Sequence, residues 1–211
     1  MFFVVFEGLD GSGKSSLMKR LESHLKNQGT DLIMTREPGG TTVGDEIREI
    51  ILKKQAQPPS SRTELLLYQA SRSQHVDLVI RPALAAKKWV LCDRFSASSI
   101  AFQGGGRGIS LDQVVWLNNF STDMLKPDLT VLLDLSVEDS KKRRTNRENQ
   151  TATSEDRIEA EADSFHEKVR KGFLDQAHAD PKNWLVLNAA HTPEELYQEL
   201  VKNLTERQWL R

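Results

Sequence analysis

The sequence predicts an α/β protein with a doubly wound, five-stranded parallel sheet and helices on both faces. Five short apolar runs alternate with longer helical patterns, which is typical of parallel strands joined by crossover helices. Each run is nearly continuous in apolar residues, as expected for strands that are covered on both faces. The 211 residues are few enough for one domain, which we expect to span residues 1–211.

The elements follow in a regular order along the chain. We expect strands over residues 2–7, 31–35, 89–92, 129–134 and 184–188. We expect helices over residues 14–28, 43–55, 62–86, 111–124, 136–147, 155–179 and 193–208. Thr192 and Glu195 form a capping-box pattern before the last helix, and Ser110 and Ser136 are weaker caps of the same kind. Gly29 is placed to end the first helix.

A long polar segment interrupts this pattern late in the chain. Residues 141–156 have the sequence KKRRTNRENQTATSED and hold no apolar residue larger than Ala152. Such a segment offers nothing to a packed core. We therefore expect an exposed, mobile lid inserted between two helices at about residues 141–156.

The balance of charge argues against a nucleic-acid or membrane partner. The chain has 29 Lys and Arg against 30 Asp and Glu, and its five histidines lack metal-ligand spacing. The single cysteine, Cys92, ends the apolar run WVLC and is expected to be a buried, unreactive thiol. No apolar run is long enough to span a membrane, and the first residues lack a signal-peptide pattern, so we expect a cytoplasmic protein.

The motif that carries chemistry is a glycine-rich turn after the first predicted strand. Residues 8–15 fit G-x-x-x-x-G-K-[ST], the P-loop, whose backbone N–H groups cradle phosphates at the start of a helix. Lys14 is expected to reach the β- and γ-phosphates, and Ser15 to hold Mg²⁺. The guanine-reading pattern N-K-x-D is missing, which argues against a GTPase switch. The expected ATP-binding residues are Gly8, Leu9, Asp10, Gly11, Ser12, Gly13, Lys14, Ser15 and Ser16.

Four arginines suited to binding an anion lie near the predicted strand ends: Arg36, Arg48, Arg72 and Arg94. Arg94 follows Asp93 at the carboxyl end of the third strand, the edge where open α/β sheets bind ligands. Asp93 can hold Mg²⁺ through water, and Arg94 can hold a phosphate by paired N–H bonds. A second set of phosphate-binding residues predicts a kinase whose acceptor is itself phosphorylated.

Five blocks of the sequence resemble the thymidylate kinase family. They are TREPGGT (35–41), LLLYQASRSQHV (65–76), CDRFSASSIAFQGGGRG (92–108), KPDLTVLLDL (126–135) and DRIE (156–159), in the family's order. The resemblance runs through nearly the whole chain and implies transfer of phosphate from ATP to dTMP with Mg²⁺, giving dTDP and ADP. It also implies a homodimer formed through helices beside the acceptor site. The ATP base is expected near residues 188–190.

The same resemblance implies the acceptor contacts residue by residue. Tyr68 matches the aromatic residue that stacks on thymine, Gln103 the residue that reads its edge, and Phe102 the aromatic packed under the sugar. Arg72 follows Tyr68 by one helical turn, so one helix is expected to supply both the base platform and a phosphate ligand. Asp10 is expected to accept from the deoxyribose 3′-OH. The implied substrate-binding residues are Asp10, Arg36, Glu37, Pro38, Arg48, Tyr68, Arg72, Arg94, Ser99, Phe102 and Gln103.

Phosphoryl transfer needs positive charge on the migrating group. The family supplies one arginine either from the P-loop or from the lid, and here the P-loop position holds Gly11. The chain thus resembles the bacterial type with a lid-supplied arginine, although residues 148–154 make its lid longer than usual. Arg147 aligns best with that arginine, with Arg143 and Arg157 as the supporting pair. The expected catalytic residues are Lys14, Asp10, Arg94, Arg147 and Arg143.

Two alternatives stay open at this point. One is another small P-loop kinase acting on a deoxynucleoside or a different monophosphate, but a nucleoside acceptor would not need Arg72 and Arg94 together. The other is a non-catalytic nucleotide-binding regulator with the same fold. Such a regulator would be expected to carry a degenerate site, whereas Lys14, Ser15 and Asp93 are all present.

Overall fold

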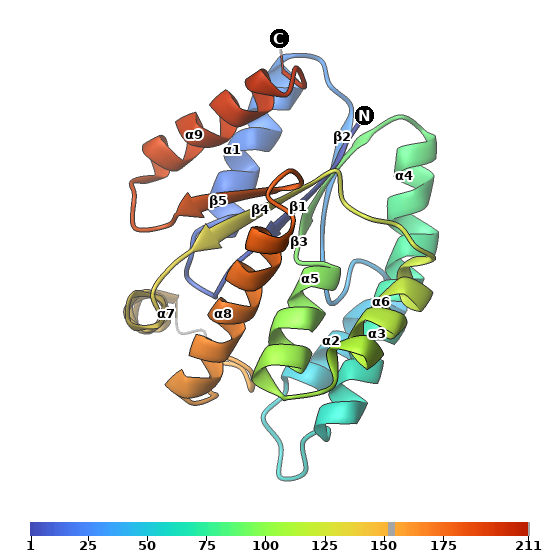
Figure 1. Cartoon of the computed structure of the whole chain (residues 1–211), viewed down its shortest axis with the longest axis vertical. Coiled ribbons are helices and arrows are strands. Elements are labelled where there is room, and N and C mark those ends of the chain that lie inside the picture. The colour runs from blue at the N-terminus through green and yellow to red at the C-terminus, as the bar shows by residue number, and fades with distance from the viewer. Residues whose placement is uncertain (152–154, 211) are drawn as a thin grey trace.

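The computed structural model describes residues 1–151 and 155–210 and contains the predicted sheet. The strands run parallel in the order β2-β3-β1-β4-β5, with β1 at the centre (Figure 1). Chain order therefore reverses beside β1, and the carboxyl ends of β1, β3 and β4 meet at one edge. The strands are β1 (Phe3–Glu7), β2 (Leu32–Arg36), β3 (Trp89–Asp93), β4 (Leu129–Asp134) and β5 (Trp184–Asn188).

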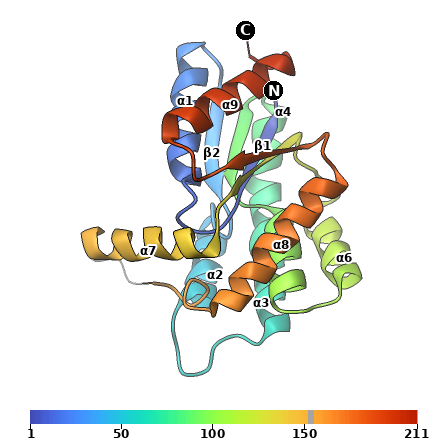
Figure 2. The same ribbon diagram turned by 60° about the vertical axis from the view of Figure 1, so that its left-hand side comes forward.

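One face of the sheet is covered by α1 (Lys14–Asn27) and α9 (Pro193–Glu206), which lie side by side in both views (Figures 1 and 2). Leu196, Leu200 and Leu204 form the predicted buried stripe of α9 and pack in one cluster with α1 and β1. The predicted capping box is confirmed, because the Thr192 side chain accepts from the Glu195 N–H and the Glu195 carboxylate accepts from the Thr192 N–H.

The other face is covered by one long helical stretch and by α8 (Asp163–Ala179). The stretch comprises α3 (Ser61–His75), a π-helical segment η1 (Val76–Ile80) and α4 (Arg81–Ala85), close to the predicted helix over residues 62–86. Pro82 has no N–H to donate, and the π-helical segment ends just before the turn that contains it. Cys92 is buried in this layer, as predicted.

Two further helices, α2 (Thr42–Leu52) and α6 (Leu111–Thr122), pack against α3 and line the side of the molecule away from α1 (Figure 1). The predicted cap of α6 is wrong in detail, because the Ser110 side chain accepts no capping bond. Ser136 does cap the helix after β4, since its Oγ accepts from the Asp139 N–H at 3.1 Å. Within the described residues, no helix has the length and apolar character needed to cross a membrane.

Residues 96–106 are helical although the sequence analysis assigned them to no element. They form α5 (Ser96–Ser99) and a π-helical segment η2 (Ile100–Gly106), which ends in three glycines that disfavour a helix. Close packing explains the glycines. A Cβ on Gly106 would lie 2.5 Å from the Phe165 ring, and one on Gly105 would lie 3.1 Å from the Lys168 carbonyl oxygen. The glycines therefore let α8 approach the backbone of η2.

The predicted lid is more ordered in its first half than expected. The helix α7 (Val137–Thr151) continues past the predicted end at residue 147 and projects from the body of the molecule (Figure 2). The next helix begins at Asp163 rather than at residue 155, because the Asp156 carboxylate accepts from the N–H groups of Ile158 and Glu159 and forms a turn there. Residues 152–154 of the predicted lid lie outside the described residues.

Candidate active site

The glycine-rich turn adopts the backbone conformation that a phosphate cradle requires. Gly8, Gly11 and Gly13 have φ angles of 135°, 79° and 98°, which L side chains rarely adopt. A Cβ on Gly8 would also lie 2.4 Å from the Leu133 carbonyl oxygen. Within the loop, Leu9 and Ser12 are buried, and the exposed hydroxyls of Ser15 and Ser16 open the helix α1. The loop therefore presents backbone N–H groups at the positive end of a helix dipole.

Lys14 places its ammonium group inside this loop. Its side chain is 7% exposed, and its Nζ donates to the carbonyl oxygens of Gly8 and Leu9 at 3.1 and 3.2 Å. Burial, together with the nearby charge of Arg94, lowers the pKa of Lys14 below its ordinary value. The positive charge of Lys14 thus lies where the N–H groups of the loop converge.

Arg94 joins the P-loop to the neighbouring strand. Its backbone takes the left-handed conformation with φ 70°, and its guanidinium pairs with the Asp10 carboxylate at 2.9 Å and lies 5.1 Å from the centre of the Phe102 ring. Burial opposes the ionisation of Asp10, but the charges of Arg94 and Lys14 outweigh burial and hold the pKa of Asp10 well below its usual range. The two predicted catalytic residues therefore form an ion pair at the strand ends.

Glu7, at the end of β1, was not predicted and organises the same loop. Its carboxylate is buried and accepts from the N–H groups of Phe95 and Ser98 and from the Ser98 hydroxyl at 2.6 Å. Burial raises the pKa of Glu7 to about 6. A glutamate just before the P-loop, at the end of an apolar strand, was the available signal in the sequence.

A cavity of about 70 Å³ opens beside this ion pair. Its walls come from the P-loop, the turn after β2, helices α2 and α3, the segment 94–103 and the segment after the lid. From the predicted substrate-binding set it is lined by Asp10, Glu37, Pro38, Arg48, Tyr68, Arg94, Phe102 and Gln103, and otherwise by Leu52, Ser98, Asp156 and Ile158. Residues far apart in the sequence thus meet next to the phosphate cradle.

Arg72 is held beneath the wall of this cavity and does not line it. The guanidinium is 1% exposed and donates to the Glu37 carboxylate at 2.7 Å. Its other acceptors are the side chains of Gln69, Ser99 and Asn118 and the carbonyl oxygen of Phe95. Protein acceptors surround Arg72 in this structure, and its contact with a phosphate stays a prediction. Ser99 is likewise buried and serves as one of these acceptors.

Glu37 and Pro38 form the predicted turn at the cavity wall, with a cis peptide bond between them. The Glu37 carboxylate also lies 3.0 Å from His75 Nδ1, within hydrogen-bond distance. Arg48 reaches this turn from α2 and donates to the Pro38 carbonyl oxygen at 3.0 Å. Arg36 lies outside the cavity, where its exposed guanidinium pairs with Asp45 at 3.0 Å. Arg48 and Arg94 are thus the two guanidinium groups among the lining residues.

The lid arginines occupy three different environments. Arg143 donates to the carbonyl oxygens of Gly11 and Ala189 at 3.3 and 2.9 Å, so it bridges the P-loop and the loop after β5. Arg144 is buried and donates to the Glu155 carboxylate and the Glu159 carbonyl oxygen. Arg147 is 41% exposed and pairs with the Glu159 carboxylate at 2.7 Å.

The lid helix rests directly on the P-loop. The Ser140 hydroxyl donates to the Asp10 carbonyl oxygen at 2.7 Å. A Cβ on Gly11 would lie 3.1 Å from the Arg143 Cβ and 3.2 Å from the Ser140 carbonyl oxygen. The glycine at this position therefore leaves room for the first turns of α7.

Asp93 and Ser15 fit a magnesium site that is shared with nucleotide phosphates. The Oδ1 atom of Asp93 is buried and has no hydrogen-bond partner among the described residues, which is unusual for a carboxylate oxygen. Within the same residues no cluster of three or more His, Cys, Asp or Glu could hold a metal by itself. Mg²⁺ commonly uses one or two carboxylates together with phosphate oxygens and water, so a single carboxylate suits it.

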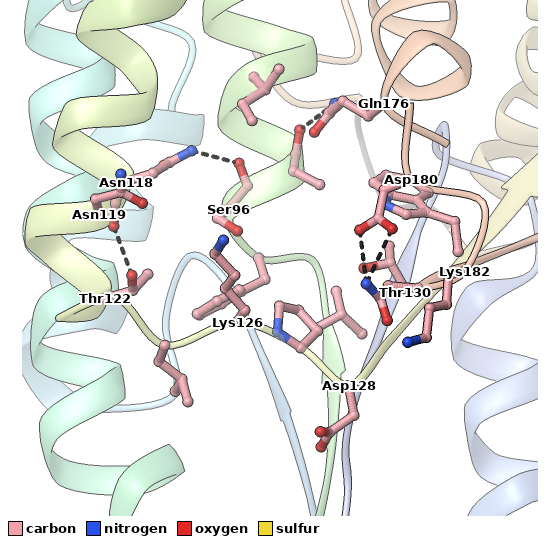
Figure 3. A pocket seen from close by; sticks show the side chains of 18 of the residues that line it. Ser96, Asn118, Asn119, Thr122, Lys126, Asp128, Thr130, Gln176, Asp180 and Lys182 are labelled. Atoms are coloured by element: carbon pink, nitrogen blue, oxygen red, sulfur yellow. Dashed lines mark hydrogen bonds between the residues drawn. The ribbon is translucent and has the colours of Figure 1, made fainter. Parts of the chain in front are cut away.

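A larger hollow of about 720 Å³ lies between α5, α6 and the C-terminal end of α8 (Figure 3). Several of its polar groups bond to one another. Asn118 donates to the Ser96 carbonyl oxygen, Gln176 to the Ala97 carbonyl oxygen, and Asn183 to the Asp180 carboxylate. It adjoins the amino end of β4, whereas ligands of open α/β sheets bind at the carboxyl ends. We therefore assign the active site to the smaller cavity.

The parallel sheet, the P-loop and an adjacent arginine-lined cavity define a P-loop kinase of the nucleoside-monophosphate class. Comparison with known proteins narrows this class. A sequence model of the family "Thymidylate kinase" matches residues 6–200. The chain therefore belongs to the thymidylate kinase family.

Individual relatives agree with this assignment. The chain is 62% identical over 210 residues to a thymidylate kinase of Bdellovibrio bacteriovorus, covering 100% of this chain and 98% of the relative. It is 45% identical to a thymidylate kinase of Geotalea uraniireducens, covering 92% of this chain and 91% of the relative. It is also 45% identical to that of Exiguobacterium sibiricum, with 96% and 93% covered.

Proposed function

We propose that this enzyme transfers the γ-phosphoryl group of ATP to dTMP, giving dTDP and ADP for nucleotide biosynthesis. Membership of the thymidylate kinase family supports the reaction class and the substrate. The observation that carries the proposal is the cavity beside the P-loop, which Arg48 and Arg94 line together with Tyr68. A nucleoside acceptor without phosphate would leave the Arg48 guanidinium, which donates to the Pro38 carbonyl oxygen, without an anion.

The donor phosphates are assigned to the P-loop. Its N–H groups and the α1 dipole bind the phosphate oxygens, and Lys14 Nζ turns from the Gly8 and Leu9 carbonyl oxygens to the β- and γ-phosphates. The loop after β5 receives the ATP base, near Ala189, whose carbonyl oxygen already accepts from Arg143.

The acceptor is assigned to the cavity with its phosphate toward the P-loop. Arg94 and Arg48 hold the phosphate, and Tyr68 stacks on the thymine ring. Phe102 packs under the deoxyribose. Asp10, kept ionised by Arg94, accepts the hydrogen bond of the 3′-OH.

The lid supplies charge for the migrating phosphoryl group. Arg147 is the best placed of the three, since its guanidinium is partly exposed, whereas Arg144 is buried and Arg143 is fixed over Gly11. We assign the transition-state contact to Arg147 and the support of the lid to Arg143 and Arg144. When bound, Mg²⁺ would be held by Ser15 and Asp93 and would neutralise charge on the donor phosphates.

A panel of acceptors tests this proposal. Release of ADP is followed by a coupled assay with ATP, Mg²⁺ and one of dTMP, thymidine, dUMP, dCMP, dGMP or UMP. We expect turnover with dTMP far above the others. Turnover that is equal among these acceptors, or faster with thymidine than with dTMP, would contradict the proposal.

We further propose that the enzyme is a cytoplasmic homodimer that pairs through α3 and α6. These helices expose a contiguous apolar face, in which the rings of Trp116 and Phe120 stack 5.8 Å apart. The exposed apolar residues of this face are Leu66, Leu111, Val115, Trp116 and Phe120. Self-association covers such a patch and leaves the cavity, on the other side of α3, open.

Light scattering after size exclusion tests the dimer. The wild-type chain is expected at twice its 23.9 kDa mass, and the Trp116→Ala/Phe120→Ala variant at the monomer mass. Val186→Ala, which changes an exposed apolar residue at the far edge of the sheet, is the control and stays dimeric. A monomeric wild-type chain at micromolar concentration would refute the dimer.

A further inference from the structure

Glu64 is a buried carboxylate that the proposed mechanism does not use. It lies on α3, one helical turn before Tyr68, and is 1% exposed. Its Oε1 accepts from Gln103 Nε2 at 2.9 Å and from Arg107 Nε at 3.1 Å. Its Oε2 accepts from Arg107 Nη2 at 3.0 Å and from Arg157 Nη2 at 2.7 Å.

These contacts keep Glu64 ionised. Burial alone would raise the pKa of Glu64, but the hydrogen bonds from Arg107 and Gln103 outweigh burial and hold the pKa below its ordinary value. An ionised carboxylate can only accept hydrogen bonds. Gln103 must therefore turn its NH₂ group toward Glu64, and the network leaves no freedom to exchange the amide nitrogen and oxygen.

The orientation of Gln103 matters because its side chain lines the cavity beside Tyr68. The hydrogen bond to Glu64 fixes the positions of the amide nitrogen and oxygen, and the carbonyl oxygen is then available as an acceptor for the edge of a base. Thymine and uracil carry a hydrogen on N3 and can donate to that oxygen, whereas cytosine has a bare N3 that would face it as a second acceptor. An unpaired acceptor in a closed site costs binding strongly.

We propose that Glu64 is a specificity-positioning residue, which fixes the Gln103 amide so that the site accepts thymine-type bases and rejects cytosine. This inference rests on the proposed function and on the base contact of Gln103 that the family resemblance implies. Arg157, in the segment after the lid, also joins this arrangement to α2, because its Nε donates to the Ile51 carbonyl oxygen. The segment after the lid and the base reader thus share one carboxylate.

The test is the ratio of kcat/KM for dTMP to kcat/KM for dCMP. In Glu64→Gln, residue 64 can offer an amide NH₂ to Gln103, so the Gln103 amide can reverse and present N–H to the base. We expect the ratio to fall by about tenfold or more, through faster turnover of dCMP relative to dTMP. Glu161→Gln is the matched control. It removes the other carboxylate of Arg107, which pairs at 2.6 Å, but does not touch Gln103, and the ratio should stay unchanged.

Rescue separates positioning from structural support. The exchange variant Glu64→Gln/Gln103→Glu keeps one carboxylate in the pair and presents only acceptor oxygen to the base, so the preference for dTMP should return. It also keeps the proposal testable if Glu64→Gln does not fold. A ratio that stays within twofold of wild type in Glu64→Gln, equal losses for both acceptors, or an exchange variant that fails to prefer dTMP would overturn the role of Glu64.

Gln103→Ala distinguishes this inference from the proposed function. If Gln103 reads the base, Gln103→Ala lowers the same ratio. An unchanged ratio in Gln103→Ala would show that Gln103 does not contact the base, and would overturn the inference. Activity on dTMP would still support the proposed function. A lowered ratio in Gln103→Ala with an unchanged ratio in Glu64→Gln would overturn the inference alone.

Discussion

The donor and acceptor halves of the site are held in place by different forces. The P-loop owes its shape to three glycines with positive φ angles and to the start of α1, all within residues 8–14. The acceptor cavity instead depends on buried carboxylates that bind arginines distant in the sequence. Glu37 pairs with Arg72 and Glu64 with Arg157, 35 and 93 residues apart. Local backbone geometry therefore builds the first half, and long-range charge pairing builds the second.

The lid, like the acceptor cavity, is held by charge pairing between residues that are not neighbours in the sequence. Glu159 provides its carbonyl oxygen to Arg144 and its carboxylate to Arg147, so one residue holds two lid arginines. Contacts of this kind are individually weak where solvent reaches them. The Arg147–Glu159 pair, in which Arg147 is 41% exposed, is therefore weaker than the buried pairs under the cavity.

The largest expected effect is the loss of kcat when the lid arginine Arg147 is removed. Arg147→Ala should lower kcat by about 10³-fold or more while the KM for dTMP stays nearly constant, because its contact is made chiefly in the transition state. Single-turnover and steady-state kinetics measure both. Lys142→Ala, an exposed neighbour on α7 paired with Glu138, is the control and should keep normal kcat. A loss below tenfold for Arg147→Ala would move the role to Arg143 or Arg144.

The next largest effect is the loss of stability when the buried Arg72–Glu37 pair under the cavity is broken. Arg72→Ala removes the guanidinium partner of the buried Glu37 carboxylate and should reduce the free energy of unfolding by about 3–5 kcal/mol. Urea denaturation measures this loss. Arg72→Lys keeps the charge but not the planar fork and should be intermediate. A variant that unfolds at the wild-type urea concentration but binds dTMP weakly would restore the original assignment of Arg72 to the ligand.

A smaller effect is expected on the KM for dTMP, and it tests which arginine of the acceptor site binds the phosphate. Arg48→Ala should raise the KM for dTMP by about 10- to 100-fold, because one charge-assisted bond to the phosphate is lost, and should change kcat much less. Arg36→Ala should have a smaller effect, since Arg36 lies outside the cavity and pairs with Asp45. Initial-rate kinetics at varied dTMP compare the two. If the effects came in the reverse order, Arg36 would be the phosphate ligand.

The smallest effect concerns Glu7 under the P-loop. Its pKa of about 6 in the folded chain exceeds the ordinary 4.5, so the folded state binds this proton more tightly. The contribution to stability is therefore present below pH 4.5 and is lost as the pH rises through 6, up to about 2 kcal/mol. Glu7→Gln removes this dependence.

Urea titrations of the wild type and Glu7→Gln at pH 4.5, 6 and 7 measure the difference. The stability of Glu7→Gln relative to wild type should rise over this range. Glu167→Gln, a change to an exposed carboxylate on α8, should leave the curve as it is in the wild type. A constant difference between wild type and Glu7→Gln would show that Glu7 titrates normally.

Much of the fold could be predicted because local pattern decides it. All five strands lie within a residue or two of their expected positions, and the capping box at Thr192 forms as its spacing indicates. The helix over residues 96–106 was missed because glycines disfavour helices in isolation, while here they are required by the approach of α8. The lid boundary was misplaced because the Asp156 turn depends on a side chain that binds its own backbone.

By itself the sequence determined the order of strands and helices along the chain and the position of the P-loop, because these depend on local pattern and spacing. Only the tertiary structure decided which arginines face the cavity and which support it. Arg72 is saturated by protein acceptors, whereas Arg48 and Arg94 line the cavity. The reason is that a guanidinium group binds a ligand or a protein carboxylate equally well, and the choice depends on acceptors brought close only by folding.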